Sequence, residues 1–221
     1  MDDKLWTAVD HYLAEKLLPD DSALKRAVER NAAEGLPAID VSALQGQFLN
    51  LLVKLHGSKR ILEIGTLGAY STICLARALP ANGKLISLEL EAHHARVAQQ
   101  NIDAAELAGR VEIRVGPALE SLAQIQAEKT EPFDFVFIDA DKVNTGPYFE
   151  RSMGLCRSGS IIIADNVVRK GQVIDGASKD PGVLGMRRII DTVAKDSRVE
   201  ATTLQTVGTK DYDGFTLIRV R

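Results

Sequence analysis

Short runs of consecutive apolar residues constrain the fold of this chain more than any other feature. The clearest examples are FDFVFID at 133–139 and SIIIAD at 160–165, and both end on an acidic residue. Apolar residues at consecutive rather than alternate positions are typical of parallel strands whose two faces are covered by helices. Because such runs alternate with longer helical stretches from residue 60 onward, the sequence predicts a doubly wound α/β sheet.

The predicted sheet is mostly parallel and has seven strands. The parallel strands are expected at 60–64, 84–89, 110–115, 133–139 and 160–165. The last two runs, 199–207 and 214–220, are joined only by the loop 208–213, which is too short for a helix. They therefore predict an antiparallel hairpin at one edge of the sheet.

Helices are added before the first strand, and the last of them carries an apolar stripe at helical spacing. They are expected at 3–17, 21–35 and 42–56. Since no linker or repeat interrupts the chain, we expect one domain over residues 1–221, with a helical segment at 1–57 and a Rossmann-like core at 58–221. The stretch 167–185, rich in glycine and charged residues, is the expected loop over a substrate.

The balance of charges disfavours one class of partner. A formal net charge of −3 argues against an extended surface for nucleic acid, which is usually strongly basic. The N-terminal segment carries Asp3, Asp10 and Glu15 among its apolar positions, so it fits neither a signal peptide nor a membrane span. We therefore expect a cytoplasmic protein that does not associate with membranes.

The ends of the first two strands suggest a nucleotide-type cofactor. Gly65 lets the backbone turn tightly and approach a ligand closely, and Glu89 stands where an acidic side chain can accept hydrogen bonds from the hydroxyls of a ribose. A nicotinamide cofactor would normally use the pattern GxGxxG, but residues 64 and 69 are Ile and Ala. S-adenosylmethionine, which has no phosphate to bind, fits this turn better, and an oxidoreductase is disfavoured.

Acidic residues also end the fourth and fifth strands, at Asp139 and Asp165. Because open α/β folds bind ligands at the carboxyl edge of the sheet, the two carboxylates are expected in one site. With the amide oxygen of Asn166 they form hard ligands that suit Mg²⁺, Mn²⁺ or Ca²⁺, whereas zinc would need clustered cysteine or histidine. Asn166 can join its neighbour only if the strand ends at Asp165, since adjacent strand residues point to opposite faces.

Lys142 follows Asp139 by three residues and is expected to face the same cavity. A nearby divalent cation disfavours the ammonium form of a lysine through like-charge repulsion. Lys142 is therefore the predicted general base. The alternative is an ordinary surface lysine on a solvated loop.

Taken together, these motifs resemble the cation-dependent class I O-methyltransferases, the group that includes the catechol and caffeoyl-CoA O-methyltransferases. The resemblance runs from residue 37 to the C-terminus. The segments that carry it include ILEIGTLGAYST at 61–72, ISLELE at 86–91, FIDADK at 137–142 and IIADNV at 162–167. The pairing of DADK with ADNV is its most specific part.

The resemblance implies an S-adenosylmethionine-dependent O-methyltransferase that acts on a small phenolic acceptor with two adjacent hydroxyls. It places Asp139, Asp165 and Asn166 on Mg²⁺ and makes Lys142 the base. The residues that it places around the cofactor are Val41, Glu63, Gly65, Thr66, Ser71, Glu89, Ala118, Asp139 and Asp141. By resemblance alone, we also expect a homodimer.

Two departures from the family pattern concern the pocket. Ala69 stands where relatives commonly have glycine, and Thr145 stands where tyrosine is common. The first is expected to place a methyl group beside the tail of the cofactor, and the second to alter the shape of the substrate pocket.

Two alternatives stay open at this point. One is a tRNA methyltransferase that acts on 5-hydroxyuridine, in which a group of cations would contact phosphates: Arg169, Lys170, Arg187 and Arg188. The other is a catalytically silent relative that only binds the cofactor or a partner. The complete set of acidic, amide and lysine side chains described above speaks against this second alternative.

Overall fold

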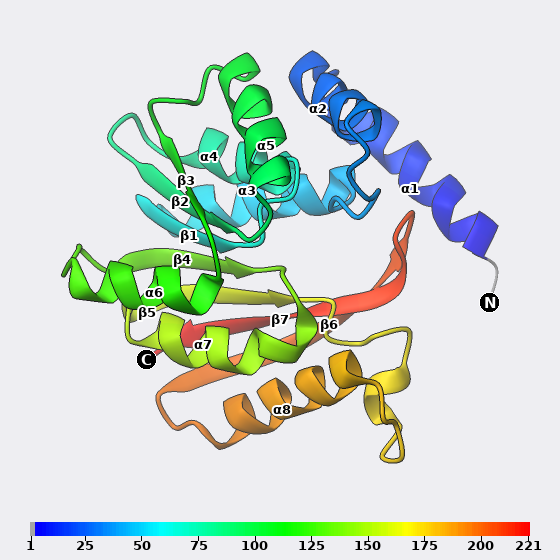
Figure 1. Cartoon of the computed structure of the whole chain (residues 1–221). Helices are drawn as coiled ribbons and strands as arrows, with labels where there is room; N and C mark the ends of the chain where they lie inside the picture. The colour runs from blue at the N-terminus through cyan, green and yellow to red at the C-terminus, as the bar shows by residue number, and fades with distance from the viewer. Residues whose placement is uncertain (1–2) are drawn as a thin grey trace.

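A single seven-stranded sheet forms the centre of the protein in the computed structural model, which describes residues 3–221 (Figure 1). The strand order is β3-β2-β1-β4-β5-β7-β6. The strands are β1 (Arg60–Ile64), β2 (Lys84–Glu89), β3 (Val111–Val115), β4 (Phe133–Ile138), β5 (Cys156–Asp165), β6 (Val199–Gly208) and β7 (Asp211–Val220). Neighbours among β1 to β5 pair in parallel, and β7 pairs antiparallel with β5 and β6. The predicted fold is confirmed; residues 1 and 2 of the predicted N-terminal segment lie outside the described range.

Several strand boundaries differ from the sequence prediction, and the differences are largest at the start of β5 and at the β6–β7 turn. β5 begins at Cys156 rather than at residue 160. The predicted loop 208–213 was wrong, because Gly208 already pairs with Asp211. In both places the backbone ladder continues through polar residues, and these carry no apolar pattern that the sequence could reveal.

Helices cover both faces of the sheet (Figure 1). One face carries α2 (Ser22–Ala33), α3 (Ala43–His56), α4 (Tyr70–Ala78) and α5 (Ala92–Ala104), and the other carries α6 (Ala118–Ala127), α7 (Thr145–Met153) and α8 (Pro181–Lys195). Every residue of β4 is buried, with Phe135 in the core of the first face and Val136 in that of the second. Consecutive apolar residues therefore serve two cores, as predicted. No helix of the described chain is long and apolar enough to cross a membrane.

The first helix, α1 (Asp3–Leu17), lies beside the tip of the β6–β7 hairpin (Figure 1). The Asp10 carboxylate accepts hydrogen bonds from the backbone N–H and the hydroxyl of Thr209, at 2.8 and 3.3 Å. No residue of α1 is buried, and apolar side chains such as Tyr12 and Leu17 are 60% and 69% exposed. A polar contact thus anchors this helix while its apolar face stays open.

The segment after β5 is more regular than its composition predicts. It contains a short 3₁₀ turn, η2 (Gln172–Ile174), and α8 already begins at Pro181. The Asp180 carboxylate accepts the N–H of Val183 at 2.8 Å and so caps α8, and proline is favoured in the first turn of a helix. The predicted irregular stretch 167–185 was therefore too long at its C-terminal end.

Candidate functional site

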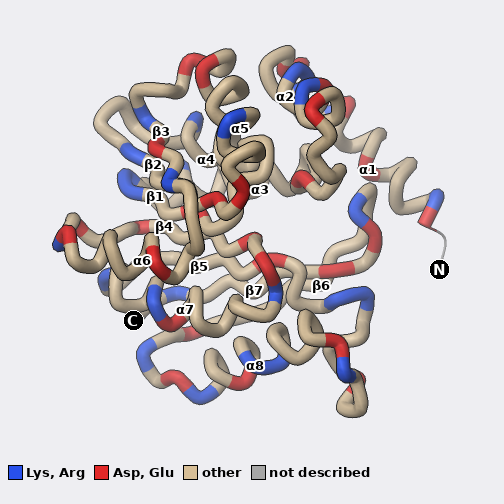
Figure 2. Tube along the Cα trace, viewed as in Figure 1, with Lys and Arg blue, Asp and Glu red and all other residues tan. Residues whose placement is uncertain are grey.

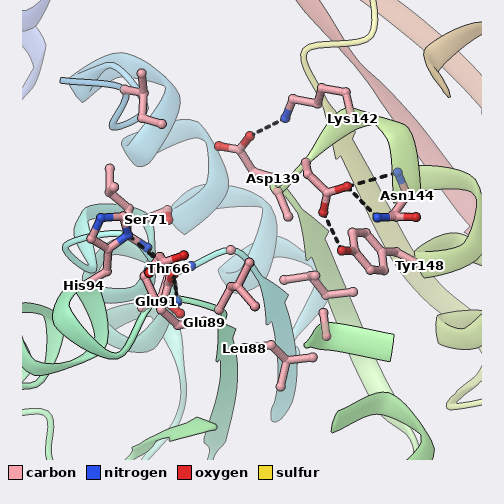
Figure 3. Close-up of a pocket in the computed structure, with 18 of the residues that line it drawn as sticks. Thr66, Ser71, Leu88, Glu89, Glu91, His94, Asp139, Lys142, Asn144 and Tyr148 are labelled. Atoms are coloured by element: carbon pink, nitrogen blue, oxygen red, sulfur yellow. Dashed lines mark hydrogen bonds and ion pairs between the residues drawn. The ribbon is translucent and has the colours of Figure 1, made fainter. Parts of the chain in front are cut away.

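A cavity of about 740 Å³ opens at the carboxyl edge of the sheet, where β1, β2 and β4 end and the segment after β5 begins. Most of the predicted site residues line it: Val41, Gly65, Thr66, Ser71, Glu89, Ala118, Asp139, Asp141, Lys142 and Asn166. The other two, Glu63 and Asp165, are only 0% and 4% exposed. Figure 3 shows Thr66 and Glu89 on what we call the β1–β2 side, and Asp139 and Lys142 on the β4–β5 side.

The turn after β1 brings these two sides together. Gly65 has a φ of +100°, a conformation that only glycine adopts without strain. A Cβ atom on Gly65 would lie 2.1 Å from the carbonyl oxygen of Asp139. The N–H of Asp139 in turn donates to the carbonyl of Ile64 at 2.9 Å. The ends of β1 and β4 are therefore in direct backbone contact, and this contact leaves no room for a side chain at residue 65.

Glu63, in β1, is buried beneath this turn. Its carboxylate accepts hydrogen bonds from the hydroxyls of Ser71, Thr72 and Ser87, at 2.6, 2.5 and 2.7 Å. Burial raises the pKa of Glu63 to about 7, although the three hydroxyl donors oppose that rise. Glu63 thus fixes the start of α4 against β2 and is linked to the cavity through Ser71, which lines it. Its own contact with a cofactor stays a prediction.

Glu89 ends β2 and faces the cavity. Its Oε2 accepts hydrogen bonds from the backbone N–H groups of Thr66 and Leu67, at 3.1 and 2.7 Å (Figure 3). Its Oε1 accepts a hydrogen bond from the backbone N–H of Glu91 at 2.9 Å. The Nδ1 of His94, a residue that the sequence did not mark, lies 3.5 Å from Oε1. The carboxylate holds the glycine turn in place and keeps capacity for a ligand hydroxyl, since an ionised carboxyl has about four acceptor sites.

Asp141 lines the cavity, but its carboxylate is engaged within the protein. It accepts hydrogen bonds from the hydroxyl of Tyr148 at 2.5 Å and from the side chain of Asn144 at 2.7 Å (Figure 3). Burial, and next the bond to Asp141, raise the pKa of the Tyr148 hydroxyl. Tyr148, in α7, therefore holds the loop 139–142 in place, a role that no local sequence pattern indicated.

On the β4–β5 side, the Nζ of Lys142 donates to Oδ1 of Asp139 at 2.7 Å (Figure 3). The two side chains are only 14% and 23% exposed. Lys142 begins a short 3₁₀ turn, η1 (Lys142–Asn144), and α8 packs against it so closely that a Cβ on Gly185 would lie 2.0 Å from the Lys142 carbonyl oxygen. Lys142 is therefore part of the cavity wall rather than a solvated surface lysine.

Asp165 and Asn166 meet the geometric condition that the prediction set. β5 ends at Asp165 and Asn166 has a φ of 56°, so the chain leaves strand geometry between them. Asp165 accepts hydrogen bonds from the N–H of Asn166 at 2.8 Å and from the side-chain amide of Gln45, in α3, at 2.6 Å. Burial, and next the negative charge of Asp139, raise the pKa of Asp165 to about 7. The two carboxylates therefore lie close enough to repel each other.

The donors on this side fit an oxygen-ligated divalent cation. Two carboxylates from adjacent strands, with one amide oxygen, are hard ligands that leave coordination positions for water or substrate. In residues 3–221, no three histidine, cysteine, aspartate or glutamate side chains gather as a metal site. The predicted set has two such side chains, and its third ligand is the amide of Asn166.

The two departures from the family pattern lie outside the cavity lining. Ala69 is fully buried and has a φ of 69° just before α4. Thr145 is 1% exposed at the start of α7. The expected effects on the cofactor tail and on the pocket shape stay predictions, and any such effect would act from behind the cavity lining.

The cations considered for tRNA lie around the loop after β5, but three of them have partners within the protein. Lys170 pairs with Asp211 at 2.8 Å, and Arg187 and Arg188 donate to backbone carbonyls at 3.2 and 3.5 Å. Arg169 lines the cavity instead. Figure 2 shows basic and acidic segments interspersed along the chain rather than a continuous basic stripe.

Comparisons with known proteins agree with this geometry. A family model described as O-methyltransferase matches residues 14–221. The catechol O-methyltransferase of Niastella koreensis is 48% identical over 221 residues, which cover 100% of both chains. An O-methyltransferase structure from Bacillus cereus in complex with SAH has a TM-score of 0.98 and 54% identity, covering 99% of this chain and 100% of the other. The O-methyltransferase TomG from Streptomyces achromogenes, involved in tomaymycin synthesis and solved with SAM, has a TM-score of 0.96 and 44% identity, covering 100% and 99%. The chain therefore belongs to the O-methyltransferase family, as an enzyme with the Rossmann-like fold of the class I members.

Proposed function

We propose that the protein transfers a methyl group from S-adenosylmethionine to one hydroxyl of a small acceptor with two adjacent phenolic hydroxyls. The proposed reaction requires a divalent cation, and Mg²⁺ is the first choice over Mn²⁺ or Ca²⁺. The observation that carries the proposal is the pairing of Lys142 with Asp139 in the cavity wall, close to buried Asp165. The catechol named for the Niastella relative supports the acceptor, and the SAH and SAM of the two solved relatives support the donor.

The β1–β2 side is where S-adenosylmethionine would bind. Glu89 would accept hydrogen bonds from the ribose hydroxyls, the backbone of Gly65 and Thr66 would meet the amino-acid part, and Val41 and Ala118 would supply apolar wall, since all five line the cavity. The donor supplies a sulfonium methyl group that is already activated toward an attacking oxygen, so the enzyme needs no covalent intermediate. What the protein adds on this side is orientation.

The β4–β5 side is where the acceptor would react. Asp139, Asp165 and Asn166 would hold the cation, which when bound lowers the pKa of an acceptor hydroxyl and orients it. Lys142 would take the proton of that hydroxyl as a neutral amine, after it has lost one of its own protons to solvent and released its hydrogen bond to Asp139.

We also propose that the open apolar face of α1 pairs with a second copy of the chain, as the family resemblance suggests. Val9, Tyr12, Leu13 and Leu17 are exposed on this helix, and a contiguous apolar patch often marks a protein interface. Light scattering should therefore give twice the chain mass of 24.0 kDa, and Leu13→Asp should give the single mass. A wild-type protein of single mass would contradict the pairing.

The cytoplasmic location and the division of the chain at residue 57 stay predictions.

The test of the proposed reaction is methyl transfer from labelled S-adenosylmethionine to caffeic acid, with Mg²⁺ and then with excess chelator. Product that disappears with chelator and returns with added Mg²⁺ would support both the acceptor and the cation. Product that forms equally well with excess chelator would show that the reaction does not require the cation. If no product forms although the cofactor binds measurably, a catechol is not the acceptor. Labelled tRNA in a parallel reaction with bulk tRNA would then favour the tRNA methyltransferase, and unlabelled tRNA would favour a catalytically silent relative.

A further inference from the structure

Arg169 is a cation in the cavity wall that the protein itself leaves uncompensated. It lines the cavity with Lys142 and Asn166. Its Nε is buried and has no hydrogen-bond partner in the part of the chain that the structure describes, and no acidic side chain there forms an ion pair with it. Lys142, by contrast, is paired with Asp139. A charge in a cavity wall without a partner of opposite sign is suited to an anionic group that a ligand brings.

The backbone around Arg169 holds the side chain in place. Asp213, in β7, accepts the N–H groups of Val168 and Arg169 at 2.9 and 3.0 Å, and the N–H of Val167 donates to the carbonyl of Gly214 at 3.0 Å. Arg169 has a φ of 55°, a left-handed conformation that a long side chain adopts where its surroundings impose it. The backbone from which the Arg169 side chain extends is therefore fixed by the first residues of β7.

Arg169 also lies on the side of the cavity where the acceptor would react. A Cβ on Gly182, in the first turn of α8, would lie 3.5 Å from Cβ of Lys142 and 3.8 Å from Nη2 of Arg169. The base of the Lys142 side chain and the Arg169 guanidinium thus lie against the same turn of α8, as does the Asp180 carboxylate, whose Oδ1 would lie 3.1 Å from that Cβ. An acceptor whose hydroxyl reaches Lys142 would bring the rest of its structure within range of Arg169.

We propose that Arg169 determines acceptor specificity by pairing with a carboxylate of the acceptor, so that the preferred substrates are catechols that carry an acid group; the proposal rests on the catechol methylation proposed above. Arginine presents a planar fork of N–H donors that matches a carboxylate through two parallel hydrogen bonds. Because Nε itself is buried, the donors available to such a carboxylate are the N–H groups of Nη1 and Nη2. A neutral catechol leaves the guanidinium without an opposite charge, whereas an acidic one supplies it.

The test compares caffeic acid with its methyl ester, which keeps both hydroxyls and removes the negative charge. At saturating S-adenosylmethionine and Mg²⁺, the wild-type kcat/KM should be higher for the acid. Arg169→Gln should lower the acid-to-ester ratio by ~10- to 100-fold, mainly through KM for the acid, because a charge-assisted pair contributes about that much. Arg169→Lys keeps the charge without the fork and should give an intermediate ratio.

Lys170→Gln is the matched control, because Lys170 is the next residue of the same loop, also has a φ of 55°, and pairs with Asp211 on the surface. It should keep the wild-type ratio. Calorimetric binding of caffeic acid in the presence of SAH and Mg²⁺ is a second readout, and Arg169→Gln should weaken it while SAH binding is unchanged.

The outcomes separate the two proposals. An acid-to-ester ratio that is equal in wild type and Arg169→Gln would overturn the role of Arg169 and leave the catechol methylation standing. Failure of the wild type to methylate either acceptor, although SAH binds, would overturn the proposed function and the role of Arg169 with it.

Discussion

The two sides of the cavity satisfy their charges in different ways. On the β1–β2 side, Glu63 accepts three hydroxyl hydrogen bonds and Glu89 accepts three from backbone amides. On the β4–β5 side, Asp139 binds Lys142, and Asp165 is buried next to the negative charge of Asp139. The first side is complete as folded, whereas the second keeps charges that the protein only partly compensates.

This difference fits two separate tasks. Donors that belong to the fold hold a site in one shape before a ligand arrives, which suits a cofactor shared by a family. Partly compensated charges suit a cation and an acceptor that bring charges of their own. We therefore expect substitutions on the β4–β5 side to act mainly on turnover, and those on the β1–β2 side to act mainly on stability.

The largest expected effect is on turnover at Lys142. Lys142→Met should lower kcat by ~10²- to 10⁴-fold, the usual contribution of a general base. Lys179 is an exposed lysine in the segment that precedes α8, so Lys179→Met is the control and should behave as wild type. A Lys142→Met enzyme with nearly wild-type kcat would show that the β4–β5 side does not supply the base.

The next effect concerns the cation that we propose to bind at Asp139. Asp139→Asn keeps the size of the side chain and removes the charge, so Mg²⁺-dependent turnover should fall by at least ~10²-fold. Calorimetry should show cofactor affinity within about threefold of wild type, which is under 1 kcal/mol. If cofactor affinity fell in parallel with turnover, Asp139 would belong to the cofactor as much as to the cation, and the division between the two sides would be lost at this residue.

The backbone contact that joins the sides should be sensitive to a single methyl group. Gly65→Ala should lower the free energy of unfolding by at least ~3 kcal/mol, because the new Cβ would lie 2.1 Å from the Asp139 carbonyl and the φ of +100° disfavours alanine. Gly109→Ala is the control, since a Cβ there meets nothing within 4 Å. Urea unfolding measures both, and a loss below about 1 kcal/mol at Gly65 would mean that the two sides can move apart at little cost.

The smallest expected effect is a pH dependence of stability at Glu63. Burial raises the pKa of Glu63 from 4.5 to about 7, so between these values the folded protein binds more protons than the unfolded chain. Wild-type stability should therefore fall as the pH rises through this window, by at most about 3 kcal/mol. Glu63→Gln has no proton to lose, and its stability relative to wild type should rise from about pH 5 to about pH 8.

Urea unfolding at the two pH values measures this difference at Glu63. Glu120→Gln, at an exposed carboxyl of α6, is the control and should show no such change. A stability difference for Glu63→Gln that does not depend on pH would mean that the three hydroxyl donors keep the carboxylate ionised in the folded protein.

Local patterns were enough to predict most of the fold and the position of the site. The run of β4, which is apolar apart from Asp134, predicted a strand buried on both faces, and its polar end predicted the edge where Asp139 lies. The length of the hairpin strands was not predictable in this way, because the edge strand β6 is exposed along nearly its whole length and has no burial pattern. The contacts of Gln45 and Tyr148 were also missed, because their partners across the fold leave no local signal, and Arg169 was considered only for the phosphates of a tRNA.

The chain's own sequence was sufficient for the order of strands and helices and for the polar residues at the strand ends, because these follow from residue types at short spacing along one backbone. Only the tertiary structure decided which partner satisfies each charge. Gln45 and Asp165 meet across 120 residues, and Arg30 meets Asn101 across 71. Such pairs depend on how helices dock on the sheet, and docking is a property of the packed core rather than of any local segment.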